Sequence, residues 1–104
     1  MSFGRWEPLD DAEAPAGPGV LQARRAEGLI DYPTGKSAMI HYGADDVALS
    51  AALERLRAAL SPADRAATLV RFAPADGREA PSETLERLLR QFAARFGAPP
   101  HRDR

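Results

Sequence analysis

The stretch YPTGKSAMIHYG, residues 32–43, contains a Gly35–Lys36–Ser37 triplet of the kind that can bind phosphate. A phosphate-binding P-loop needs the pattern GxxxxGK[ST] between a strand and a helix, whose N-terminal N–H groups cradle the phosphate. Here Ile30 occupies the position of the first glycine, and the residues after Ser37, AMIHYG, predict a strand rather than a helix. We therefore expect a hairpin turn with Gly35 at a positive φ angle and Lys36 in solvent, and no nucleotide cofactor.

His41 is the side chain whose type best suits proton transfer near neutral pH. An imidazole that is neutral at pH 7 can act as a general base. His41 alternates with Ile40 and Tyr42 in a strand-like run, so its ring should project from the opposite face of the strand. A histidine held by one structural hydrogen bond is the simpler interpretation, and the catalytic interpretation stays open.

Arginines on two predicted helices could form a surface that follows a phosphate backbone if the helices lie side by side. These are Arg55, Arg57, Arg87, Arg90 and Arg95. Interleaved glutamates at positions 54, 83 and 86 would dilute such a patch. Glu83 and Glu86 each precede an arginine by four residues, the spacing of an ordinary ion pair on a helix surface. A solvated face of mixed charge is therefore the favoured interpretation.

The composition excludes several classes of protein. With 104 residues, 44% hydrophobic and 28% charged, the sequence is typical of one small globular domain. The lack of cysteine excludes disulfides, thiolate metal sites and cysteine nucleophiles, and two histidines leave little for a histidine-based metal site. A net charge of −1 gives no general attraction to nucleic acid or membranes. No apolar run is long enough to span a membrane and no signal peptide is recognisable, so we expect a cytoplasmic protein.

The front half of the chain is predicted to be rich in hairpins. Residues 1–17 lack apolar periodicity and predict an irregular arm, which Trp6 and Leu9 could pin onto a single domain at residues 18–97. The pattern then predicts a strand around Val20, a turn at Glu27–Gly28, a short strand at residues 29–32, a Pro/Gly turn at 33–36 and a buried strand at 37–43.

The back half has helical periodicity. A helix from about Val47 to Leu60 is predicted by leucines on one face, followed by a short helix in SPADRAA and a third main strand at residues 68–72. A second long helix is predicted from Pro81 or Ser82 to a stop at Gly97, with a frayed tail at residues 98–104. These patterns predict an α/β (α+β) domain: a small, mostly antiparallel three-stranded sheet flanked by two main helices and a short third one.

The order of these elements resembles that of GIY-YIG domains, small α/β modules best known as nuclease domains. Gly19–Val20–Leu21 stands where the family has its GIY triplet, and His41–Tyr42–Gly43 stands where it has YIG. The later segment EAPSETLERLLRQFAARFG resembles the helix that carries the family's metal-binding glutamate, which places Glu86 in that role. The resemblance covers residues 18–97 and implies a GIY-YIG-like fold.

Most of the family's catalytic groups are missing here. In active members two motif tyrosines help to position and deprotonate the attacking water, a helix arginine steadies the phosphate, and an asparagine lies near the end. In this chain Leu21 and His41 replace the tyrosines, the arginine position falls at Ala51 or Ala52, and no asparagine is present. Because phosphodiester cleavage needs a held metal, an activated water and charge stabilisation, these losses favour a noncatalytic domain.

Two functions are compatible with the resemblance. The first, which the sequence favours, is a noncatalytic binding or adaptor module in a bacterial cytoplasm, with a protein or a nucleic acid bound through the sheet face or the Trp6 arm, and no cofactor. The second is a divergent metal-dependent DNA endonuclease, with His41, Tyr42 and Glu86 as catalytic residues, Mg²⁺ or Mn²⁺ held by Glu86, and Arg55 or Arg57 on the phosphate. The oligomeric state is open, because an exposed strand at residues 28–32 could pair with a second copy.

Overall fold

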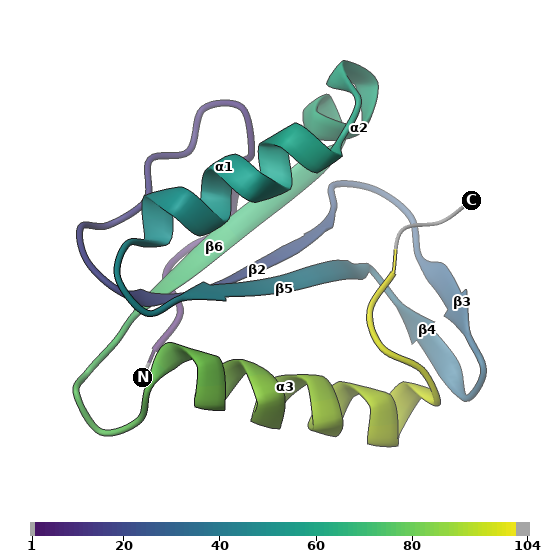
Figure 1. Cartoon of the computed structure of the whole chain (residues 1–104). Helices are drawn as coiled ribbons and strands as arrows, with labels where there is room; N and C mark the ends of the chain where they lie inside the picture. Colours follow the sequence, from purple (N-terminus) through teal and green to yellow (C-terminus); the bar gives the residue numbers. More distant parts are fainter. Residues whose placement is uncertain (1, 102–104) are drawn as a thin grey trace.

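A four-stranded antiparallel sheet, a separate two-stranded hairpin and three helices form the fold in a computed structural model, which describes residues 2–101 (Figure 1). The strand order in the sheet is β1 (Glu7–Pro8), β6 (Thr68–Pro74), β2 (Gly19–Arg25) and β5 (Met39–Asp45). The hairpin pairs β3 (Ile30–Tyr32) with β4 (Gly35–Ser37), and the helices are α1 (Leu49–Ala59), α2 (Pro62–Ala66) and α3 (Pro81–Phe96). The fold class is therefore α+β, and the sheet has four strands where the sequence predicted three.

Strand β2 lies in the centre of the sheet and is buried on both faces. It pairs antiparallel with β5 on one side and with β6 on the other. Val20 and Leu21 point to opposite faces, and both are completely buried. Gly19 allows α1 to approach closely, because a Cβ atom there would lie 2.6 Å from Leu49 Cδ1 and 2.5 Å from the Ala73 carbonyl oxygen.

Helices α1 and α3 cover opposite faces of the sheet (Figure 1). α1 buries a leucine stripe made of Leu49, Leu53 and Leu56, which belongs to the main core together with Leu21. α3 turns Phe92 towards the other face, where its ring lies 5.8 Å from that of Tyr42 with the ring planes at 82°. Amphipathic helices on both faces account for the burial of β2.

The helix ends follow the predictions closely. α1 begins at Leu49 rather than Val47, because Asp45 Oδ1 accepts hydrogen bonds from the N–H groups of Val47 at 2.9 Å and Ala48 at 2.7 Å and holds a turn there. α3 ends at Gly97, which adopts the left-handed conformation with φ 82° expected of a helix stop. Within residues 2–101, no helix is long and apolar enough to cross a membrane.

The N-terminal arm is built into the domain. Glu7–Pro8 adds the fourth strand, an edge strand paired with β6, and proline is tolerated at such an edge. Leu9 is completely buried in the main core. The guanidinium of Arg57 on α1 donates hydrogen bonds to the backbone carbonyls of Leu9 at 2.8 Å and Ala12 at 2.7 Å. Leu9 therefore pins the arm onto the domain, as the sequence predicted. Strand β1 could not be predicted, because a strand of two residues has no periodicity.

The Gly35–Lys36–Ser37 triplet lies on strand β4, so it opens no helix that could bind a phosphate. The chain turns at Pro33–Thr34, between the paired Tyr32 and Gly35. The expectation of a positive φ angle at Gly35 is wrong, because the glycines with positive φ are Gly17, Gly28, Gly77 and Gly97. The predicted turn at residues 33–36 begins at the correct residue but extends two residues too far, because Gly35 and Lys36 pair with β3 as part of β4.

The start of the predicted frayed tail is packed against the hairpin. Ala98 contacts the main core, and the His101 N–H donates a 3.0 Å hydrogen bond to the Tyr32 hydroxyl. The rings of Tyr32 and His101 lie 4.7 Å apart. In the structure, residues 98–101 therefore contact the rest of the domain, and residues 102–104 lie outside the described part of the chain.

We expect Leu9→Ala to lower the free energy of unfolding by about 2–5 kcal/mol, because it leaves a cavity under the arm. The measurement is urea unfolding followed by circular dichroism. Val47→Ala is the matched control, since Val47 is 78% exposed, and it should change stability by less than about 0.5 kcal/mol. Equal effects of the two substitutions would show that the arm is not part of the core.

Candidate functional site

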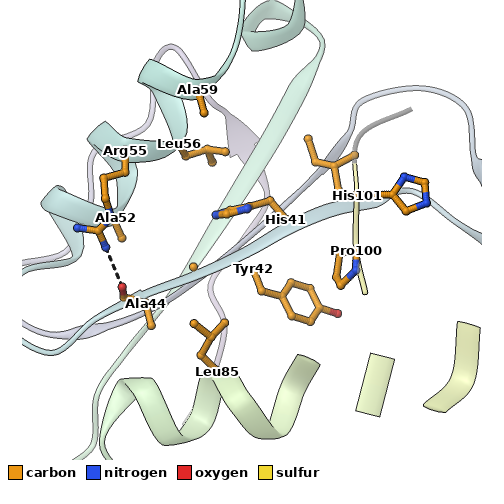
Figure 2. Close-up of a pocket in the computed structure, with 12 residues that line it drawn as sticks. His41, Tyr42, Ala44, Ala52, Arg55, Leu56, Ala59, Leu85, Pro100 and His101 are labelled. Atoms are coloured by element: carbon orange, nitrogen blue, oxygen red, sulfur yellow. Dashed lines mark hydrogen bonds between the residues drawn. The ribbon is translucent and has the colours of Figure 1, made fainter. Parts of the chain in front are cut away.

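A groove of about 600 Å³ follows the sheet edge that β5 forms (Figure 2). α1 borders it on one side, and α3 and the C-terminal segment border it on the other. Side chains able to contact a ligand there are His41, Tyr42, Arg55, Leu56, Leu85 and His101. The groove is therefore lined by His41 and Tyr42, the two candidate catalytic residues of β5 that the sequence singled out.

His41 and Tyr42 point to opposite sides of β5, as the alternation predicts (Figure 2). The half-buried imidazole of His41 extends towards α1 and packs close to Gly43, where a Cβ atom would lie 3.1 Å from His41 Nε2. The Tyr42 ring extends to the α3 side and contacts Phe92. Burial is the main cause that raises the pKa of Tyr42, so its hydroxyl is neutral at physiological pH.

Arg55 lines the α1 side of the groove, and its guanidinium is held by the chain itself. It forms an ion pair with Asp45 at 3.1 Å and donates to the Ala44 carbonyl at 2.9 Å (Figure 2). The carboxylate of Asp45 also accepts hydrogen bonds from the N–H groups of Val47 and Ala48. These contacts fix the junction between β5 and α1, so a phosphate bound by Arg55 would compete with them.

Glu86 is exposed on α3 and is not among the residues that line the groove. The structure brings His41, Tyr42 and Arg55 to one groove but does not bring Glu86 there. Within residues 2–101, no group of three or more His, Asp or Glu side chains is arranged to hold a metal ion.

The helix arginines do not form one surface, because α1 and α3 lie on opposite faces of the sheet (Figure 1). Arg57 on α1 is tied to the arm and to Glu54, and Arg87 on α3 pairs with Glu79 at 3.0 Å rather than with Glu83. Arg90 and Arg95 are exposed on α3.

A second group of charged and aromatic residues lies on the sheet itself, which the sequence reasoning missed. The guanidinium carbons of Arg24 and Arg71 lie 4.5 and 4.4 Å from the centre of the Trp6 ring. We call Trp6, Arg24 and Arg71 the arginine–tryptophan cluster. The sequence signal for this cluster was Arg71, an arginine inside the apolar run TLVRF. Its neighbour Arg24 on β2 could be identified only from the strand register.

Comparison with protein-family models, with curated proteins and with solved structures found no match.

Asp45→Asn should flatten the acid limb of the stability profile. Hydrogen bonds from Ala48, Val47 and Arg55 lower the pKa of Asp45 from its ordinary value of about 3.9. A lowered folded-state pKa stabilises the fold fully above the unfolded value, and this stabilisation is lost as the pH falls through the folded value. Urea unfolding between about pH 5 and pH 2.5 measures the effect.

The control for this profile is Asp31→Asn, an exposed carboxylate 3.5 Å from Lys36 Nζ. It should leave the acid limb as in the wild type. An unchanged profile in Asp45→Asn would contradict the role assigned to Asp45.

Proposed function

We propose that this chain is a noncatalytic binding module on a degenerate GIY-YIG-like fold, in the cytoplasm, with a protein or a nucleic acid as its partner. The order of strands and helices along the chain supports the resemblance: Gly19–Leu21 lies on β2, His41–Gly43 on β5, and Glu86 on α3. The chemistry of these positions then argues for binding without catalysis.

The observation that carries the proposal is the burial of Leu21. Its side chain replaces the first motif tyrosine and is completely buried in the core under α1. An apolar side chain without solvent access can neither orient nor deprotonate a water molecule. One of the two groups that would activate the nucleophile is therefore replaced by a core residue.

The position expected for the phosphate-binding arginine also holds a small apolar residue that cannot bind phosphate. Ala52 is 3% exposed and packs in the core, and Ala51 beside it is partly buried. Arg55, one helical turn later, already binds Asp45 and the Ala44 carbonyl. Charge stabilisation on a phosphorane would require this guanidinium to leave its partners.

The nuclease alternative is favoured by one observation: His41, Tyr42 and Arg55 line the same groove. A base, a phenol and a guanidinium are groups that phosphodiester hydrolysis can use. In this alternative Glu86 would hold Mg²⁺ or Mn²⁺, but its exposed position outside the groove weighs against this.

The two functions are separated by a cleavage assay on branched and linear DNA with Mg²⁺ or Mn²⁺ at low salt. We expect no metal-dependent cleavage by the wild type, and the same baseline for Glu86→Ala and His41→Ala, because buried Leu21 replaces one of the two water-activating groups and Glu86 lies outside the groove. Metal-dependent cleavage that Glu86→Ala abolishes would make this chain a divergent nuclease. Glu86→Ala also distinguishes intrinsic activity from a contaminating nuclease, which would cleave equally in the wild-type and Glu86→Ala preparations.

A further inference from the structure

Two arginines lie together on the sheet face opposite α1. In the register, Arg71 on β6 pairs with Gln22 on β2, and Arg24 pairs with Leu69, so Arg24 and Arg71 are diagonal neighbours on one face. The paired residues Ala23 and Val70 come one position before Arg24 and Arg71 on their strands. Both point to the other face and into the main core.

This part of the face is open to a ligand. α3 packs mainly against β5 and β2, which leaves the β6 side of the face to the N-terminal arm. There the arm places Trp6 over Arg24 and Arg71, and Phe3 with its ring centre 4.9 Å from the Arg71 guanidinium. All four side chains are partly exposed, so an approaching ligand can reach them.

The positive charge of the cluster is not neutralised by the described part of the chain. Within residues 2–101, neither Arg24 nor Arg71 forms an ion pair. Arg71 Nε donates a 2.7 Å hydrogen bond to Gln22 Oε1, while Arg24 Nε is buried without a hydrogen-bond partner. Burial, and then the charge of Arg24, lower the pKa of Arg71. Two guanidiniums are thus held close together at an electrostatic cost that an anion would offset.

Anchoring of the arm explains only part of this arrangement. One cation–π contact would be enough to hold an indole, and the arm is already fixed by Leu9 and Arg57. A second guanidinium adds repulsion and leaves a polar atom without a partner, which a merely structural contact does not need. Paired guanidiniums match the oxygens of a phosphate group, which accepts hydrogen bonds in a bidentate manner.

We propose that the arginine–tryptophan cluster binds the phosphates of a single-stranded nucleic acid, with Trp6 and Phe3 as stacking surfaces for bases. The inference rests on the proposed binding function and names its partner. Arginines beside partly exposed aromatic rings on a sheet are suited to unpaired bases, whose faces are free to stack. A carboxylate-rich peptide would use the arginines but not the rings.

The first experiment uses Trp6 as the reporter, because it is the only tryptophan in the chain. The full chain is titrated at low salt with mixed-sequence single-stranded DNA and RNA of about 16 nucleotides, and the intrinsic fluorescence and the anisotropy of a labelled oligonucleotide are followed. We expect quenching of the Trp6 fluorescence in parallel with the anisotropy increase, because a base stacks on the indole.

Arg71→Gln and Arg24→Gln should each weaken the binding by about tenfold, since each removes charge-assisted hydrogen bonds. Each should also reduce the slope of log K against log salt by about 0.7 per lost phosphate contact. Arg78→Gln is the matched control: it changes the net charge equally, at an exposed position in the loop before α3, and should alter the affinity by less than about twofold. Circular dichroism checks the fold, and if one arginine variant fails to fold, the other variant and the Trp6 signal carry the test.

Several results would overturn the inference. These are absence of binding, binding without a change in Trp6 fluorescence, equal loss in Arg78→Gln, and competition by poly-glutamate as effective as that by the oligonucleotide. None of them affects the proposal of a noncatalytic binding module; absence of any oligonucleotide binding would favour a protein as its partner, and binding without the Trp6 signal would place the nucleic acid elsewhere on the surface. Metal-dependent cleavage of the oligonucleotide, by contrast, would overturn the noncatalytic proposal itself.

Discussion

Burial of strand β2 on both faces is the constraint on which the arrangement of this chain depends. β5 and β6 satisfy its backbone hydrogen bonds, and a helix covers it on each side. The lack of a side chain at Gly19 permits α1 to approach at van der Waals distance, while Val20 and Leu21 fill the two faces. Residues 19–23 of this strand are buried and offer no surface to a ligand, whereas Arg24 and Arg25 at its end are partly exposed. The two candidate sites described above lie at the outer edge of β5 and on the part of the sheet face that α3 leaves uncovered.

The same constraint explains the different positions of residues that are neighbours in the sequence. His41 and Tyr42 are adjacent, yet one lies on the α1 side and the other contacts Phe92 of α3. The arginines of the two long helices are likewise separated by the thickness of the sheet. Arg55 and Arg57 are used to fix α1 to β5 and to the arm, and these contacts account for both residues without any ligand.

Elements with sustained periodicity could be predicted from the sequence, and contacts that depend on register could not. The leucine stripe of α1, the stop at Gly97 and the three main strands follow from local patterns. Strand β1 and the packing of His101 on Tyr32 depend on surfaces that exist only after folding. For the site, alternation predicts that His41 and Tyr42 diverge, but the meeting of Arg24 with Arg71 requires the pairing of Gln22 with Arg71, which no local pattern encodes.

The N-terminal arm connects the core to the candidate phosphate site. Leu9 enters the main core on the α1 side, and Arg57 holds the backbone of the arm from the same side. Trp6, three residues earlier, lies over the opposite face with Arg24 and Arg71. The arm is anchored independently of these arginines, by the pairing of Glu7–Pro8 with β6 and by the burial of Leu9. A ligand that draws the guanidiniums away from the ring therefore does not release the backbone that carries Trp6, so the indole stays on the same face of the sheet while the charged groups bind.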